Sequence, residues 1–189
     1  HDMLRFITLC LLLVLILMPA QGALLVWSTG NFAGRTSDVA AWLDASGMFD
    51  SVTGVDTDIL SLNDLLAYDQ VLYFSNGSYG QDPVAIGDVL DSYAATGRRL
   101  VLATFSWSGQ GGNTLAGNII ANGTSPFVTN GASLYSPATM GWIDGSGFFK
   151  GVGSVGGLFR DNVVLTPGAT LRATWSDGTP LLATNGNVV

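Results

Sequence analysis

The chain has 189 residues, a length that suits one domain, and its 48% hydrophobic content is enough for a packed core and argues against disorder. The formal net charge is −7; all 14 acidic residues are aspartates, and Lys150 is the only lysine. A surface with so few cations lacks the Lys/Arg stripe that binds phosphates, which excludes nucleic acid and anionic lipid as expected partners.

The first predicted element is an N-terminal targeting segment. Arg5 precedes an apolar run over residues 6–18, and the small residues Ala20 and Gly22 follow it. This order is typical of a secretory signal peptide that is cleaved after Gly22. The alternative is a retained membrane anchor, but a spanning helix needs about 20 apolar residues and this run is shorter. We therefore expect residues 1–22 to be a signal peptide and residues 23–189 to be a single domain with no stable membrane span.

Removal of this segment would also remove two chemically important residues. His1 is the only histidine and Cys10 the only cysteine of the chain. The mature part would then contain no disulfide, no Cys–His pair, no Ser–His–Asp triad and no zinc site with a histidine ligand. We expect no metal and no cofactor.

Apolar segments and amphipathic segments alternate over residues 23–105. The predicted strands cover residues 23–27, 51–55, 70–75 and 99–105. One helix is predicted over residues 38–46, capped by Ser37 or Asp38, and a short one near residues 62–66. A third is predicted from Pro83, with Asp82 as its cap and Gly97 at its end. This alternation predicts an α/β fold in which helices cover both faces of a mostly parallel sheet.

The C-terminal part has a different texture. A short helix is predicted over residues 115–121, and after it come turn residues with brief apolar pieces at 127–128, 133–135, 148–149, 162–165, 170–175 and 180–183. Asp177-Gly178 between two of these pieces is a strong hairpin signal. We expect a β-rich C-terminal extension, antiparallel, on one edge of the sheet. Another strand begins at residues 187–189, so we expect the domain to be truncated at its C-terminal strand.

Three segments together resemble the class I glutamine amidotransferase-like superfamily, in particular its ThuA-like and related secreted branches. They are AYDQVLYFSNGS (67–78), DVLDSYAATGRRLVLATF (88–105) and LTPGATLRATWSDGTPLLA (165–183). The resemblance covers roughly residues 24–189 and implies a flavodoxin-like, three-layer α/β/α fold.

The chain departs from this family at its catalytic turn. Catalytic members carry a cysteine in a G-x-C-x-G turn after the strand, and a histidine downstream. The corresponding turn here is residues 104–108, with Ser106 in the place of the cysteine, and no histidine follows. A serine nucleophile would need a base, and Lys150 is the only amine that could serve. Amidotransfer chemistry therefore cannot be assigned to any residue of this chain.

Two other kinds of site lack their usual motifs. Residues 108–114 are rich in glycine, but they match neither the P-loop nor the dinucleotide-binding pattern. Asp56, Asp58 and Asp64 offer oxygen ligands for calcium, but Leu60 stands where the third ligand of a calcium loop belongs. We interpret these aspartates as solvated loop residues.

Uncharged loops follow three of the predicted strands, at residues 28–34, 75–81 and 106–113. In an open parallel sheet, ligands bind beyond the carboxyl ends of the strands. Amides mixed with aromatic rings suit a neutral polyhydroxyl ligand such as a glycan, although Asn, Ser and Gly are also simply good loop formers. The candidate ligand-binding residues are Asn31, Asn76, Tyr79, Ser106, Trp107, Gln110 and Asn113.

The sequence therefore favours a secreted, periplasmic or cell-surface bacterial domain that binds a glycan or another surface component without catalysis. One alternative is a ThuA-like hydrolase or sugar-processing enzyme that uses Asp, Ser or a metal, and another is a structural module of a longer surface protein. The enzyme would require an Asp side chain that converges on loop 106–113 in a deep pocket. The glycan-binding module would require Trp107 or Tyr79 to be exposed.

Overall fold

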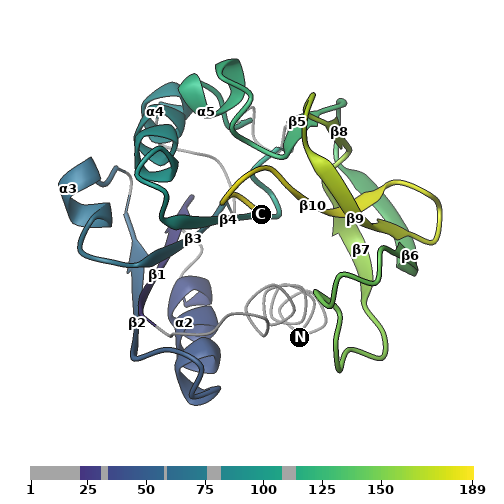
Figure 1. Ribbon diagram of the computed structural model, residues 1–189, viewed down its shortest axis with the longest axis horizontal. Helices are drawn as coiled ribbons and strands as arrows, with labels where there is room; N and C mark the ends of the chain where they lie inside the picture. Colours follow the sequence, from purple (N-terminus) through teal and green to yellow (C-terminus); the bar gives the residue numbers. More distant parts are fainter. Residues whose placement is uncertain (1–21, 31–33, 58, 76–81, 108–113) are drawn as a thin grey trace.

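The computed structural model describes residues 22–30, 34–57, 59–75, 82–107 and 114–189, and Figure 1 shows how their elements are arranged. A parallel sheet with its helices lies on one side, and antiparallel strands lie on the other. Among the described residues, no helix has both the length and the apolar character to cross a membrane.

The parallel sheet contains β1 (Ala23–Thr29), β2 (Ser51–Asp56), β3 (Gln70–Ser75) and β4 (Arg99–Ala103), in the order β2-β1-β3-β4. All six residues of β3 are buried. A continuous apolar run is typical of such a strand, which is covered on both faces. The four predicted strands are confirmed. β4 ends two residues before the predicted limit, because the chain turns there and the N–H of Ser106 donates to the carbonyl of Ala103 at 3.0 Å.

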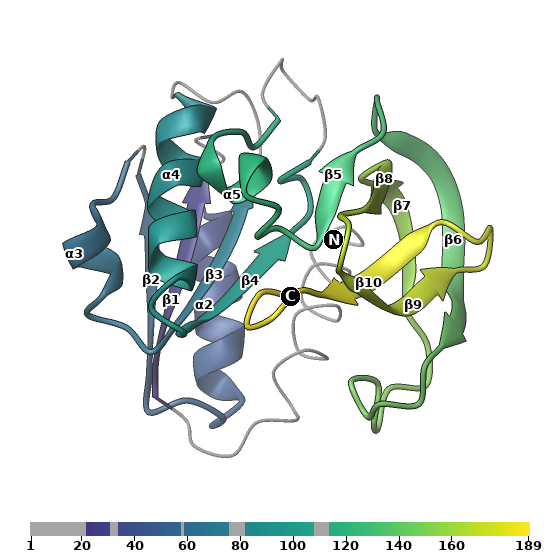
Figure 2. The ribbon, with the colours of Figure 1, turned by 45° about the horizontal axis from the view of Figure 1, so that its top comes forward.

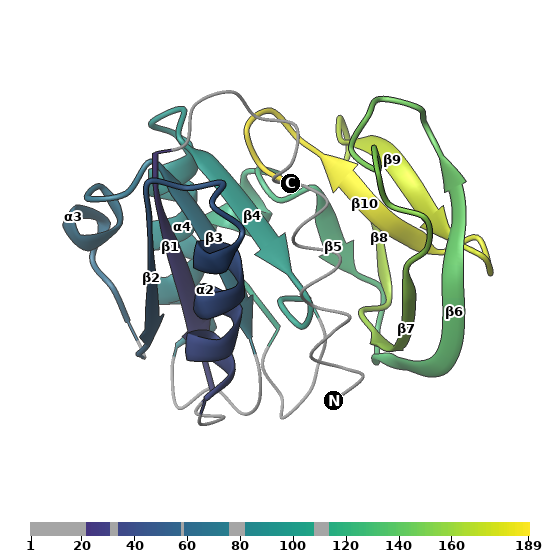
Figure 3. The same cartoon turned by 90° about the horizontal axis from the view of Figure 1, so that it is seen from below.

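Helices lie on both faces of this sheet (Figures 2 and 3). α2 (Arg35–Ala45) covers one face, while α4 (Pro83–Ala94) and the short α5 (Asn118–Ala121) cover the other. Alternate strand residues divide between the two cores: Leu24 and Val26 pack with α2, and Leu25 and Trp27 pack with α4. This alternation follows from the two-residue period of a strand.

The predicted capping residue is correct for α4 and wrong for α2. α4 begins as predicted, with Pro83 at its first position and the Val84 N–H donating to Asp82 Oδ1 at 2.9 Å. The predicted cap of α2 is wrong. This helix begins three residues earlier, because Gly34 has a φ of 91° and turns the chain into the helix there without a side-chain cap.

A capping box forms the start of the short helix α3 (Leu62–Leu65). The N–H of Ser61 donates to Asp64 Oδ2 at 2.8 Å, and the N–H of Asp64 donates back to Ser61 Oγ at 3.3 Å. Asp64, which the sequence also offers as an oxygen ligand, therefore has a structural role. Among the described residues, no group of three His, Cys, Asp or Glu side chains is placed to hold a metal; Asp58 lies outside the described residues.

The C-terminal half is β-rich, as predicted. Its strands are β5 (Phe127–Thr129), β6 (Leu134–Ile143), β7 (Gly156–Arg160), β8 (Val163–Leu165), β9 (Thr170–Trp175) and β10 (Pro180–Thr184). The hairpin predicted at Asp177-Gly178 joins β9 to β10. The apolar piece at residues 148–149 is a turn, and Phe149 is buried in a small core beneath the antiparallel sheet.

The sequence predicted that these strands extend one edge of the parallel sheet, and this prediction is wrong. They form a separate four-stranded antiparallel sheet, β10-β9-β6-β7, and a two-stranded sheet, β5-β8. The edge of β4 is instead taken by the end of the chain, where Val188 pairs in parallel with Leu100. The N–H of Leu102 donates to the carbonyl of Val189 at 2.8 Å, so the chain returns to the parallel sheet after β10.

Candidate functional site

The turn after β4 holds Ser106, the residue that the sequence resemblance would place at the position of a nucleophile. Ser106 is completely buried, and its hydroxyl donates to the carbonyl of Ala103 at 2.7 Å. Lys150 lies exposed in a turn of the antiparallel half, with its N–H bonded to the carbonyl of Gly147. A fully buried hydroxyl and an exposed amine do not form a Ser–Lys dyad, so the hydroxyl of Ser106 serves to close the turn.

Trp107 is part of the core. Its side chain is 4% exposed, the indole N–H donates to Ser125 Oγ at 3.0 Å, and the ring packs edge-on against Phe127 with centroids 5.3 Å apart. A buried ring of this kind fixes the turn against β5. Trp107 is therefore not the exposed aromatic ring that a glycan-binding site at this position would require.

The remaining predicted ligand-binding residues lie outside the described residues. They are Asn31, Asn76, Tyr79, Gln110 and Asn113. Their role in binding stays a prediction, and only Ser106 and Trp107 of that set can be placed.

Hydroxyl groups lie where β1 and β3 end, next to the predicted loops. Thr29 Oγ1 and the Tyr73 hydroxyl are hydrogen-bonded at 3.0 Å, and Ser28 is hydrogen-bonded to Thr36. Ser28, Thr29 and Ser75 are all buried. Because the connections from β1 and β3 leave in opposite directions, this edge is a topological switch point, where ligands bind in open α/β sheets. Its described part is neutral and polar.

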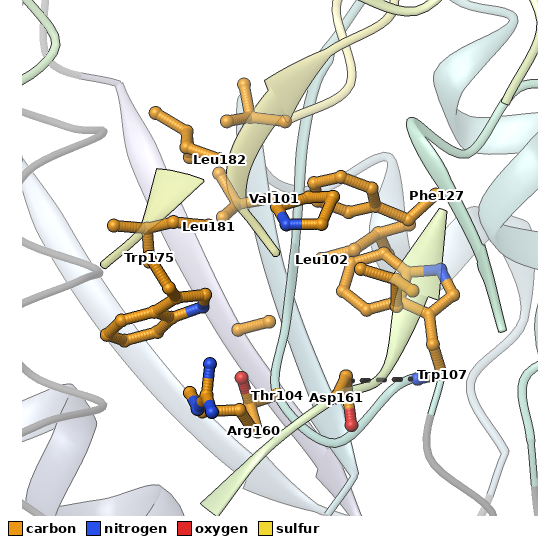
Figure 4. A pocket seen from close by; sticks show the side chains of 14 residues that line it. Val101, Leu102, Thr104, Trp107, Phe127, Arg160, Asp161, Trp175, Leu181 and Leu182 are labelled. Carbon is orange, nitrogen blue, oxygen red and sulfur yellow. Dashed lines mark hydrogen bonds between the residues drawn. The ribbon is translucent and has the colours of Figure 1, made fainter. Parts of the chain in front are cut away.

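A cavity of about 90 Å³ lies between β4 and the antiparallel half, next to the turn that carries Trp107 (Figure 4). The cavity is mainly apolar, and polar groups reach it from the end of β7. Residues that line it include Leu102, Trp107, Arg160, Asp161, Trp175 and Leu182.

Arg160 is the buried cation of this cavity. Its guanidinium is held by Thr179 Oγ1 at 3.1 Å, by Ser136 Oγ at 3.0 Å and by Asp177 Oδ2 at 2.8 Å. It also lies over the ring of Trp175, 5.3 Å from the centroid. Its Nε is buried and has no hydrogen-bond partner among the described residues.

The carboxylate of Asp177 pairs with this guanidinium. The hydrogen bond from Arg160 and then that from Thr179 lower the pKa of Asp177 to about 2. Asp177 is therefore ionised at neutral pH, and it compensates the buried charge of Arg160.

Asp161 connects the cavity to the turn after β4. It is 8% exposed, and its Oδ2 accepts the N–H of Trp107 at 3.3 Å across 54 residues of sequence. Figure 4 shows its side chain beside that of Thr104 on the wall of the cavity. The enzyme alternative required an Asp side chain that converges on loop 106–113 in a deep pocket; Asp161 lies at the start of this loop, and residues 108–113 lie outside the described residues.

Sequence reasoning missed both Arg160 and Asp161. The available signal was the adjacent pair Arg160-Asp161 between two apolar strands, in a chain with only 11% charged residues. It also missed the exposed aromatic residues of β6, where Tyr135 is 58% and Trp142 54% exposed.

Comparison with known proteins adds no assignment. The chain matches no protein-family model, no curated protein and no solved structure.

Proposed function

We propose that this chain is a secreted or cell-surface bacterial domain that binds a ligand without catalysing a reaction on it, on a flavodoxin-like, amidotransferase-like scaffold. The strand order β2-β1-β3-β4, with Val188 beside β4, supports that scaffold, because flavodoxin-like sheets have this order. Helices on both faces of the sheet agree with a three-layer arrangement.

One observation carries the non-catalytic part of the proposal. Ser106 stands where a nucleophile would act, yet it is completely buried and its hydroxyl donates to the carbonyl of Ala103. A nucleophile must reach the substrate and must be deprotonated by a base. Ser106 meets neither condition, which supports a site without a serine nucleophile.

The proposed ligand is a neutral polyhydroxyl compound, as in a cell-surface glycan. The described edge of the sheet at Thr29 and Ser75 is uncharged but buried, so the proposal assigns the ligand contacts to the loops beyond it, which contain amides and Tyr79. With Trp107 buried, Tyr79 is the aromatic residue to which we assign stacking on a sugar ring.

A glycan array probed with the secreted chain tests this proposal. We expect a saturable signal that Tyr79→Ala weakens at least about ten-fold, or about 1.4 kcal/mol. Trp142→Ala is the matched control, since it removes an exposed aromatic residue from the antiparallel sheet, and it should bind as well as the wild type. No binding by the wild type, or a loss with Trp142→Ala alone, would contradict the proposed site.

The second candidate function is a hydrolase, and the position of Asp161 favours it. This buried carboxylate lies on the cavity wall at the turn after β4, where a general acid or base could act. A panel of glycoside and ester substrates distinguishes the two functions. Turnover that Asp161→Asn abolishes, while Ser106→Ala leaves it intact, would replace the binding proposal by the hydrolase.

A further inference from the structure

The first residue of β1 is held by a single aspartate. The N–H of Ala23 donates to Asp69 Oδ2 at 2.9 Å, and the carbonyl of Ala23 accepts the N–H of Asp69 at 3.0 Å. Asp69 immediately precedes β3, whose first residue, Gln70, pairs with Leu24. Asp69 therefore binds both main-chain groups of Ala23 at the point where the parallel sheet begins.

The folded core starts at this point. Ala23 pairs with Ser51 of β2, and Leu24 is completely buried. A break in the chain before Ala23 would leave every residue of β1 and all its strand pairing in place. The bond between Gly22 and Ala23 is also the one at which small residues end the N-terminal apolar segment.

We propose that Asp69 is the counter-ion of a new N-terminal ammonium group, formed at Ala23 when the Gly22–Ala23 bond is hydrolysed during export. This inference rests on the proposal that the protein is secreted. Water supplies the oxygen of the new Gly22 carboxylate, and the nitrogen of Ala23 leaves as an amine. An α-amino group has a pKa of about 7.7–8.0, so it is mainly protonated at neutral pH. The amide hydrogen bond to Asp69 becomes a charge-assisted one.

The surroundings of Asp69 favour this role. Arg98 forms no ion pair with it, and its guanidinium donates to the main-chain carbonyls of Leu66 and Tyr68. Among the described residues, no side-chain cation forms an ion pair with Asp69. A carboxylate aimed at the first main-chain nitrogen of the sheet is thus left for the ammonium group.

The geometry of Gly22 adds a second argument. A Cβ at this position would lie 2.1 Å from Asp69 Oδ2 and 2.5 Å from Asp69 Cβ, so a larger residue would displace this carboxylate. Glycine before the cleaved bond meets the small-residue preference of signal cleavage. It also lets the uncleaved chain keep Asp69 against Ala23.

Export of the full chain in a bacterial host tests the cleavage. N-terminal sequencing and intact mass of the exported protein should show Ala23 as the first residue. An exported protein cut at another bond would overturn this inference and leave secretion standing. A chain retained in the cell with residues 1–22 attached would overturn both.

The ion pair is tested on the exported protein with and without chemical acetylation of its N-terminus. Asp69→Asn should lower the folding equilibrium constant about two- to five-fold when the amine is free, the range expected of an exposed ion pair. It should have a clearly smaller effect when the amine is acetylated. Asp50→Asn, an exposed aspartate just before β2, is the matched control and should show no dependence on acetylation. An equal effect of Asp69→Asn in both forms would overturn the proposed ion pair.

Discussion

Arg160 and Asp177 join the end of β7 to the turn between β9 and β10, with 2.8 Å between Arg160 Nη2 and Asp177 Oδ2. The burial of this pair is one-sided, because the side chain of Arg160 is 1% exposed and that of Asp177 is 41% exposed. Loss of the Asp177 carboxylate would therefore leave the buried guanidinium of Arg160 without its counter-ion.

Replacement of Asp177 by alanine should destabilise the fold through this stranded cation. Removing one partner of a fully buried pair costs about 3–5 kcal/mol; because Asp177 is partly exposed, we expect a loss of about 2 kcal/mol in the free energy of unfolding. Urea denaturation measures this. Asp144→Ala is the matched control, since its partner Arg172 is 29% exposed, and it should cost about 1 kcal/mol or less. Equal losses in both variants would contradict the prediction.

The same ion pair should affect how steeply the stability of the fold decreases at acid pH. The pKa of Asp177 is lowered from 3.8 to about 2 in the folded protein. A lowered folded-state pKa contributes stability above the unfolded value, and this contribution is lost as the pH falls from about 4 towards 2. Thermal unfolding between pH 2 and 7 should show a shallower acid limb for Asp177→Asn than for the wild type. Identical limbs would show that this carboxylate titrates alike in both states.

Asp161 should be more sensitive to alanine than to asparagine. Asn keeps an acceptor for the N–H of Trp107, whereas alanine leaves that buried donor without its partner. An unsatisfied buried donor costs about 1–3 kcal/mol, so Asp161→Ala should lose that much and Asp161→Asn clearly less. Chemical denaturation of the two variants provides the comparison. Similar losses of stability in the two variants would show that the charge of Asp161, and not its hydrogen bond to Trp107, is what stabilises the fold.

Gly87 should tolerate no side chain, because α4 and α5 are in close contact there. A Cβ at Gly87 would lie 1.7 Å from the carbonyl oxygen of Ala116. Gly87→Ala forces main-chain atoms apart, for which we expect a cost of about 1–3 kcal/mol. Gly153→Ala is the control, since nothing lies within 4 Å of its Cβ position, and it should change stability by no more than about 0.5 kcal/mol. A lowered thermal midpoint for the control alone would contradict this account.

Val188 should behave as a core residue although it is next to last in the sequence. It is completely buried and pairs in parallel with Leu100. Val188→Ala should cost about 2 kcal/mol, close to the value for full burial of a valine side chain. Val164→Ala, at a position of β8 that is 44% exposed, is the control and should be nearly neutral. Urea midpoints that are equal for the two variants would show that residues 187–189 do not hold to β4.

The elements of the parallel half could be predicted because their signals are local. Continuous apolar runs mark the inner strands, and Asp82 with Pro83 marks the start of α4, where a cap and a fixed φ act within one turn. The start of α2 could not be predicted, because it depends on the φ of Gly34, which neighbouring residue types do not specify. The resemblance to amidotransferase-like proteins predicted a nucleophile position at Ser106, and the sequence has no histidine after this residue.

By itself, the sequence determined the α/β character, the acidic surface and the lack of cysteine and histidine beyond residue 22, because composition and short-range periodicity suffice for these. Only the tertiary structure decided how the two halves meet. It buried Trp107 against Phe127 and directed Asp161 to the N–H of Trp107, and within the antiparallel half it placed Arg160 against Asp177. The physical reason is that each contact joins segments that are separated in the chain, so the types of the neighbouring residues do not specify it.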